Sequence, residues 1–332
     1  MTLKKNLWLS PLVLISIPLL VFLISLVMGR YPQPLFMPLS VLFNDELAQR
    51  LVFSLRLPRL LSALCLGMSL SAAGGVMQML FRNPLVEPGF LGVTQGAGFG
   101  AALCIIFLGT SPLLIETSAT LFAVLGLLFS YFIARRIRFG GWVLRLILAG
   151  IAVSAFFSAG LGILKYLADP TSQLPEITFW LLGGLWSVTW PDLFYILPVV
   201  VIGLVIIYLM RWRLNLLSLG DETAASLGVS VKRERTLLLG VSVAITAVVV
   251  SVAGIVGWIG LIIPHIARRL VGANSANFIP VSMSIGGAFA ILCDDIARTL
   301  SAGEIPLGII TSLLGAVIFL ILMVSPGMRL QR

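Results

Sequence analysis

The sequence predicts an all-α membrane protein that crosses a bilayer about ten times. Hydrophobic residues make up 59% of its 332 positions, and charged residues only 11%. A soluble domain carries about 25% charged residues, so this chain lacks the polar shell that a globule of its size needs. The apolar runs are continuous rather than alternating, which excludes a transmembrane β-barrel.

Ten apolar runs, separated by charges and by clusters of Pro and Gly, mark the predicted spans. They lie at residues 9–29, 58–80, 91–109, 112–134, 143–166, 192–210, 237–256, 258–268, 277–299 and 306–325. The first run is too long for the apolar core of a signal peptide and lacks a small-residue cleavage site, so we expect it to be retained. We expect residues 1–332 to form a single transmembrane domain.

The distribution of Lys and Arg orients these spans. With the N-terminus in the cytoplasm, 16 of the 22 basic residues fall on the cytoplasmic side. We therefore expect both termini to be cytoplasmic. The basic residues left outside are Arg30, Arg50, Arg56, Arg59, Lys165 and Arg298. Topology thus explains the net charge of +9, and no nucleic-acid partner is expected.

Few residues in the chain offer reactive chemistry. Cys65, Cys104 and Cys293 lie in apolar runs, at spacings that fit neither a metal site nor a disulfide. The one histidine, His265, cannot build a metal centre by itself. No GxxxxGK(S/T) string is present, so ATP hydrolysis by this chain is not expected by that route. We expect no catalytic residue, no metal site and no cofactor.

The string RNPLVEP at residues 82–88 is predicted to form a rigid turn on the cytoplasmic side. Pro84 and Pro88 prevent a regular helix there. Asn83 can satisfy backbone groups that the break frees. The alternative is a part in a cytoplasmic gate or in a contact with a partner.

A second proline lies in GLIIPHIARR at residues 260–269. Pro264 should stop or bend the short span at 258–268. His265 lies close to Arg268 and Arg269, and we expect it to make a structural hydrogen bond. A role in proton transfer is the alternative.

Two connections are too polar to span. Residues 30–57 are expected to form an external loop. Residues 211–236 form the longest cytoplasmic connection and contain a short helical pattern. Asp221 is a plausible N-cap for that helix, and Gly228 a plausible stop with positive φ.

Four strings are more specific than hydropathy alone. They are RLPRLLSALCLGMSLSAAGGVMQMLFRNPLVEPGFLGVTQGAG (56–98), LGDETAASLGVSV (219–231), AGIVGWIGLIIPHIARRLVG (253–272) and DDIARTLSAGEIPLGIITSLLGAVIFLILM (294–323). Together they resemble the FecCD family of ABC importer permeases, over about residues 50–325.

The resemblance implies a homodimer of ten-span subunits in the bacterial inner membrane. It implies two ATPase subunits that bind from the cytoplasm and a substrate-binding protein that docks from outside. It also implies that residues 219–231 are the coupling segment that transmits ATPase movement. The coupling residues would be Asp221, Glu222, Ala225, Ser226, Leu227 and Gly228.

The resemblance further implies that outer arginines pair with acidic residues of the binding protein. Arg56, Arg59 and Arg298 are the candidates, because an arginine fork can bind a carboxylate in bidentate fashion. The alternative is snorkelling or internal pairing with Asp294, Asp295 or Glu304. The spacing of Arg298 from Asp294 and Asp295, four and three residues, predicts such an internal ion pair.

The function that follows is the membrane-spanning subunit of an ATP-driven importer of a metal chelate such as iron–siderophore, haem or cobalamin. The pathway would lie at the homodimer interface, with a neutral wall that carries polar groups such as Gln78 and Gln95. An oxyanion such as molybdate remains an open substrate. An ion-coupled secondary transporter is the rival class, but it would need carboxylates in mid-span. A membrane enzyme would need a cluster of His, Asp or Cys, which the sequence does not suggest.

Overall fold

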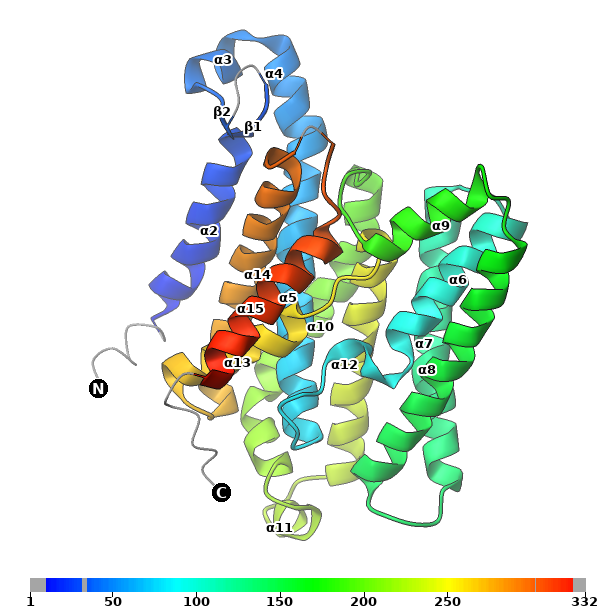
Figure 1. The fold of residues 1–332 in the computed structure, drawn as a ribbon. Helices are drawn as coiled ribbons and strands as arrows, with labels where there is room; N and C mark the ends of the chain where they lie inside the picture. Colours follow the sequence, from blue (N-terminus) through cyan, green and yellow to red (C-terminus); the bar gives the residue numbers. More distant parts are fainter. Residues whose placement is uncertain (1–9, 32–34, 302, 325–332) are drawn as a thin grey trace.

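The computed structural model describes residues 10–31, 35–301 and 303–324, which are almost entirely helical (Figure 1). The long helices are α2 (Pro11–Val27), α5 (Leu57–Leu80), α6 (Val93–Phe107), α7 (Pro112–Arg136), α8 (Trp142–Leu167), α10 (Trp190–Leu217), α12 (Val231–Ala253), α13 (Ile259–Val271), α14 (Ser275–Thr299) and α15 (Leu307–Val324). Each predicted span overlaps one of them.

Shorter elements connect the long helices. They are α3 (Leu39–Asn44), α4 (Glu46–Arg50), the π-helical segment η1 (Leu51–Arg56), the 3-10 turn η2 (Pro88–Leu91), α9 (Gln173–Leu182) and α11 (Asp221–Ser226). A small antiparallel ladder joins β1 (Met28–Gly29) to β2 (Leu35–Phe36), with Met28 opposite Phe36. The predicted termini, and Pro32 and Pro34 of the predicted outer loop, lie outside the described residues.

Seven helices in the described part of the chain are long and apolar enough to cross a membrane. They are Glu46–Leu80, Pro112–Arg136, Trp142–Leu167, Trp190–Leu217, Val231–Ala253, Ser275–Thr299 and Leu307–Val324. Two shorter apolar helices, Leu12–Val27 and Val93–Phe107, accompany them. The protein is therefore a multi-pass membrane protein.

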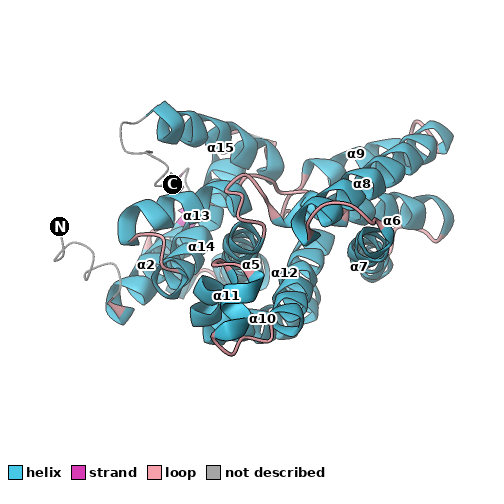
Figure 2. Cartoon of the chain, turned by 90° about the horizontal axis from the view of Figure 1, so that it is seen from below, coloured by secondary structure: helices cyan, strands magenta, loops and turns pink. Residues whose placement is uncertain are grey.

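Helix α5 forms the centre of the bundle, with α10, α12, α13 and α14 packed around it (Figure 2). In its apolar window 83% of the residues are buried, against 28% in α10 and α15. Small residues permit this burial, because a Cβ added to Gly67 would lie 2.0 Å from the carbonyl oxygen of Gly286 on α14. Such close approach is typical of helix packing in membranes.

The outer connection at residues 30–57 is more helical than predicted. Helix α4, η1 and α5 run on without a break from Glu46 to Leu80, although Pro58 lies inside this stretch. In the π-helical register the carbonyl of Phe53 would accept a hydrogen bond from the N–H of residue 58, but Pro58 has no N–H. Trp190 Nε1 donates to that carbonyl at 3.0 Å instead.

Of the two outcomes predicted for Pro264, a stop or a bend, the structure excludes the stop, because α13 continues to Val271. A proline leaves the carbonyl four residues earlier without its helical donor, and here that carbonyl belongs to Gly260. Gln78 Nε2 on α5 lies 3.3 Å from the Gly260 oxygen and 3.2 Å from the Leu261 oxygen. A side chain distant in the sequence thus supplies the missing donor.

Pro18 in α2 follows the same rule. The carbonyl that it leaves free is that of Leu14, which accepts a hydrogen bond from Ser284 Oγ on α14 at 2.7 Å. At several points in this bundle, polar side chains therefore replace the hydrogen-bond donors that are missing at internal prolines. This is a common solution in membranes, where no water can satisfy the free carbonyl.

The segment after α5, predicted as a rigid turn on the cytoplasmic side, reaches into the bundle. Ser130 Oγ on α7 donates to the Leu91 carbonyl at 2.9 Å, and Gly92 lies against Val153 on α8. Val153 lies near the middle of α8, and Ser130 lies within α7, before its last turn. Residues 82–92 thus turn back into the interior before α6 begins (Figure 1). Irregular backbone is tolerated at that depth when protein surrounds it.

Candidate functional site

The short helix α11 lies at one end of the molecule, between α10 and α12 (Figure 1). The connection that carries it is shorter than predicted, because α10 extends to Leu217 and α12 begins at Val231. The helix starts one residue away from the predicted cap: Gly220 is the N-cap, and Asp221 is the first helical residue.

A buried arginine holds α11 to the bundle. Arg235 on α12 donates to the Asp221 carboxylate, with Nη1 3.1 Å from Oδ2. The Arg235 guanidinium lies 4.7 Å from the centre of the Trp142 ring on α8. Its hydrogen bond to Asp221 lowers the pKa of that carboxyl below its usual value. Asp221 therefore stays ionised and bound at neutral pH.

The remaining coupling candidates form an exposed face on α11. Glu222, Ala225, Ser226 and Gly228 are exposed, and the side chain of Leu227 is 55% exposed. Ala224 and Val229 point the other way and are buried. The exposed face thus has an apolar residue and small neighbours that a partner can approach closely.

Gly228 ends this helix with φ +79°, in the left-handed region. Its N–H donates to the Ala225 carbonyl at 3.0 Å. A Cβ added at this position would meet nothing within 4 Å, so the need for glycine comes from its backbone conformation.

The two predicted proline strings contact each other. Asn83 Oδ1 accepts from the Leu85 N–H at 2.9 Å and closes the turn after α5. The carbonyl of Pro84 lies 3.0 Å from His265 Nε2 on α13. His265 thus joins the turn to the helix that contains Pro264, a contact typical of a structural histidine.

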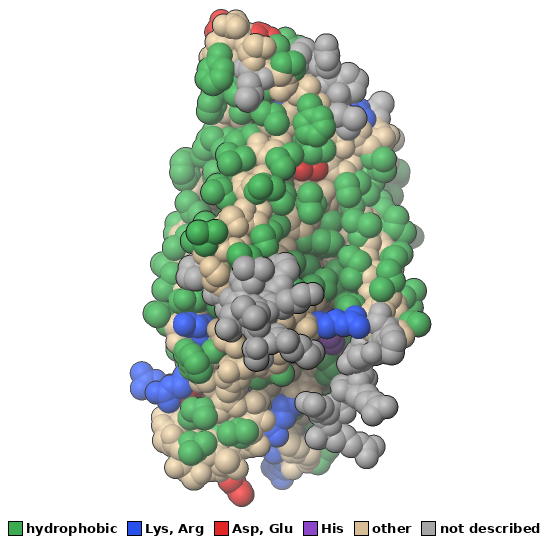
Figure 3. Space-filling model, turned by 90° about the vertical axis from the view of Figure 1, so that its left-hand side faces the viewer, with side chains coloured by type: hydrophobic (Ala, Val, Ile, Leu, Met, Phe, Trp, Pro, Cys, Tyr) green, Lys and Arg blue, Asp and Glu red, His purple; other side chains and the backbone are tan. Residues whose placement is uncertain are grey.

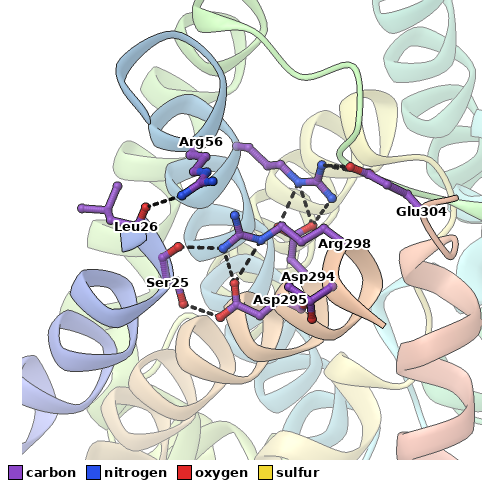
Figure 4. Close-up of polar contacts among 9 residues, drawn as sticks. Ser25, Leu26, Arg56, Asp294, Asp295, Arg298 and Glu304 are labelled. Carbon is purple, nitrogen blue, oxygen red and sulfur yellow. Dashed lines mark hydrogen bonds and ion pairs between the residues drawn. The ribbon is translucent and has the colours of Figure 1, made fainter. Parts of the chain in front are cut away.

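A cluster of charged residues lies at the opposite end of the molecule from α11 (Figure 4). Arg59 on α5 donates to Asp294 on α14 and, through Nη1, to Glu304 at 2.9 Å. Arg298 pairs with Asp295 and donates to the Ser25 carbonyl at 2.7 Å. The ion pair between Arg298 and the acids of its own helix is therefore present as predicted.

The three outer arginines that we predicted as docking residues differ in burial and in their partners. Arg59 and Arg298 are each 9% exposed and occupied by internal carboxylates. Arg56 is half-buried, and its Nη1 donates to the Leu26 carbonyl at 3.1 Å. Of the three, Arg56 is not paired with a carboxylate among the described residues. Ser25, whose hydroxyl donates to Asp295, belongs to the same cluster and carries no recognisable signal in the sequence.

A groove of about 860 Å³ opens between these two ends, beside α15. Its wall is mainly apolar and comes from residues 85–90, the end of α9, residues 255–261 and one face of α15. Glu87 and Ser312 are its polar side chains. Gln78, which we expected on a pathway wall, instead donates to carbonyls of α13.

Two residues of this groove were not singled out from the sequence. Glu87 places a carboxylate among apolar side chains, in the segment that turns back into the bundle. Trp258 adopts φ +71°, which is uncommon outside glycine and marks local strain. A tryptophan in the sequence does not predict a positive φ, and only the three-dimensional path of the chain reveals it.

These features define a class of protein: a multi-pass membrane protein with an open groove between an exposed short helix at one end and a buried charged cluster at the other, as expected of a transport protein. The model of the FecCD transport family matches residues 17–325. The chain belongs to this family.

Relatives with named substrates cover nearly the whole chain. The molybdate import system permease protein MolB of Haemophilus influenzae is 40% identical over 93% of this chain and 94% of its own length. The hemin transport system permease protein HmuU of Yersinia pestis is 38% identical, over 91% and 92%. A probable iron chelatin transport system permease protein of Helicobacter pylori is 40% identical over 84% of both chains.

A solved structure has the same fold. It is described as an inward-facing conformation of a metal-chelate type ABC transporter, and it superposes with a TM-score of 0.86 at 39% identity. The match covers 93% of this chain and 97% of the other.

Proposed function

We propose that the chain is the membrane-spanning permease subunit of an ATP-driven importer that carries a metal chelate into a bacterial cell. Two copies would form the pathway, two ATPase subunits would bind from the cytoplasm, and a binding protein would deliver substrate from outside. The family assignment supports this function.

The observation that carries the proposal is the construction of α11. Arg235 fixes its first residue and Ala224 is buried, while Ala225, Ser226 and Leu227 face outward. A short helix held rigidly on one side and open on the other suits the transmission of movement from a partner. Its apolar anchor, Leu227, fits a groove-binding helix. We therefore assign ATPase coupling to residues 219–231.

We also propose ten spans with both termini in the cytoplasm. The ten long helices support this number, although three of them, α2, α6 and α13, are shorter than the rest. The basic residues around α11, among them Arg82, Lys232 and Arg233, support a cytoplasmic position for that end.

For docking of the binding protein we propose Arg56 as the first candidate. Its guanidinium has no internal carboxylate partner among the described residues, so an acidic residue of a partner would complete its pairing. Arg59 and Arg298 would act in docking only by exchanging an internal carboxylate for an external one. We propose for these two a supporting position behind Arg56.

The groove beside α15 is our candidate for one wall of the pathway. The face of α15 that lines it includes Ile309, Ser312 and Leu313, and the groove is open. A second copy placed against this side would close it into a channel. Because the wall is mainly apolar, it would release a bulky chelate readily and leave selectivity to the binding protein.

The substrate has a second candidate. The relative from Haemophilus influenzae named for molybdate has the same 40% identity to this chain as the iron chelatin relative, over a larger share of it, 93% against 84%. We propose a metal chelate as the main substrate class and molybdate as the specific rival.

Proteoliposomes that contain the permease, its ATPase and its binding protein test both points. We expect uptake of an iron chelate that requires ATP and stops when any component is omitted. Uptake driven by an ion gradient without the ATPase would refute the proposal. Molybdate uptake with no chelate uptake would keep the importer and change its substrate.

A further inference from the structure

A second groove, of about 720 Å³, lies on the side of the molecule away from α15. It runs between α2, α5, α10 and α14. Its apolar wall includes Leu14, Ile15, Leu19, Phe22, Leu64 and Met68. Figure 3 shows the neighbouring face, where many hydrophobic side chains lie in the upper and middle parts and most Lys and Arg lie in the lower half.

The groove is built into the fold rather than left by loose packing. Pro18 of α2 and Pro280 of α14 both line it. Next to Pro18, Ser284 Oγ donates to the freed carbonyl of Leu14 at 2.7 Å, which fixes α2 to α14. Its volume falls within the roughly 300–1,000 Å³ of small-molecule pockets.

One end of this groove is cationic and aromatic. Arg211 lies there with its guanidinium carbon 3.9 Å from the centre of the Tyr208 ring, and Nη1 donates to the Tyr208 carbonyl at 2.6 Å. Trp212 is beside it and 59% exposed. Within the described residues Arg211 has no carboxylate within 4 Å, whereas the neighbouring Arg213 pairs with Glu234 at 3.4 Å.

This combination fits an anionic phospholipid. The phosphate would bind to the Arg211 guanidinium, which is suited to bidentate contact with phosphate. Tyr208 and Trp212 are residue types that lie at the level of lipid headgroups. An acyl chain would extend along the apolar wall toward Phe22.

We propose that the groove between α2 and α10 binds one anionic phospholipid, with its phosphate at Arg211. Arg211 lies on the last turns of α10, which leads through residues 218–220 into α11. The lipid would therefore hold α2 against the helix that supports the coupling segment. This site is separate from the proposed pathway and does not depend on the transported substrate.

Native mass spectrometry of the assembled transporter, released from nanodiscs of defined lipid composition, tests the site. In nanodiscs that contain equal phosphatidylglycerol and phosphatidylcholine, we expect each permease chain to retain phosphatidylglycerol. Arg211→Gln should lower this retention at least about tenfold, as expected for the loss of a hydrogen bond to a charged group. Arg138→Gln, an exposed arginine between α7 and α8, is the matched control and should retain lipid normally.

Ile15→Trp is the second variant, because Ile15 lines the groove but is 65% exposed, so the protein should fold. The indole should fill the groove and reduce retention while Arg211 remains. Equal retention of the two lipids, or unchanged retention in both variants, would overturn the proposal. Disulfide-linked permease pairs formed by Ile15→Cys would also overturn it, because they would place a second copy in the groove. ATP-dependent uptake is measured separately, so failure of the lipid site leaves the importer proposal standing.

Discussion

Arg59 on α5 and Asp294 on α14 form a buried two-pronged ion pair. Nε lies 2.9 and 3.0 Å from the two carboxylate oxygens, and Nη2 lies 2.9 Å from Oδ1. The Asp294 side chain is 0% exposed and that of Arg59 11%. The pair joins the central helix to α14 in the part of the bundle where binding-protein contacts are proposed.

The first prediction is that Asp294→Asn destabilises the protein strongly. It leaves the Arg59 guanidinium buried without its main partner, a change that costs about 3–5 kcal/mol in buried pairs. Thermal unfolding in detergent, followed by size exclusion, measures this. Glu304→Gln removes the other partner of Arg59, but Glu304 is 39% exposed and the cost should be only about 0–1 kcal/mol. Equal melting temperatures for the two variants would contradict the structural role of the buried pair.

The second prediction separates docking from internal pairing. Arg56→Gln removes the charge but keeps a donor for the Leu26 carbonyl, so the melting temperature should change little. Binding of the substrate-binding protein should weaken by several-fold, since an exposed ion pair is worth about 0–1 kcal/mol. Surface plasmon resonance at two salt concentrations measures it. Arg298→Gln should instead lower stability, because Asp295 is 2% exposed. Unchanged affinity in Arg56→Gln would remove Arg56 from the docking surface.

The positions of the long helices were predictable because a helix that crosses a bilayer needs a continuous run of apolar residues, and these runs are visible in the sequence. The internal prolines show what the apolar runs do not predict, namely whether a helix continues through a proline. Pro264 and Pro58 break a helix in isolation, yet both lie within continuous helices here. The donors that stabilise them, Gln78 and Trp190, are distant in the sequence. No local rule identifies such partners.

The candidate site likewise contains features that the sequence predicts and features that only the fold reveals. The short helix α11 and its glycine stop were predictable, since glycine is the residue that a left-handed helix end favours. The partner of Asp221 was not predictable, because Arg235 is one of several basic residues after α11 and only the fold selects it. From the sequence, residues 82–88 were predicted only as a rigid turn on the cytoplasmic side. The depth of residues 82–92 follows from contacts such as Ser130 with Leu91.

The third prediction concerns the pH dependence of α11. The folded pKa of Asp221 lies below its ordinary value of 3.8, so its pairing stabilises α11 above that value and is lost as pH falls through the folded pKa. A spin label at Ser226→Cys should therefore show constant mobility between about pH 5 and 8 and become mobile only below about pH 4. With Asp221→Asn added, it should be mobile throughout. Loosening between about pH 6 and 7 would point to a group other than Asp221.

The last prediction tests whether α11 transmits ATPase movement. Ala225 is exposed beside Leu227, so Ala225→Arg should fold and insert normally but clash with a closely fitting partner. ATP-dependent uptake should fall at least about tenfold, and stimulation of ATPase activity by loaded binding protein should fall with it. Ala225→Ser, which adds one oxygen atom, is the control and should retain most of both activities.

Gly228 gives an independent test of the same helix, because its requirement is conformational. At φ +79° a β-branched residue is strained, by roughly 1–2 kcal/mol, whereas asparagine tolerates this region. Gly228→Val should therefore reduce uptake and ATPase stimulation together, and Gly228→Asn should have a much smaller effect. Since nothing lies within 4 Å of an added Cβ, steric conflict inside the chain does not explain a loss. Normal uptake by Ala225→Arg, in a complex that still contains the ATPase, would remove the coupling role from α11.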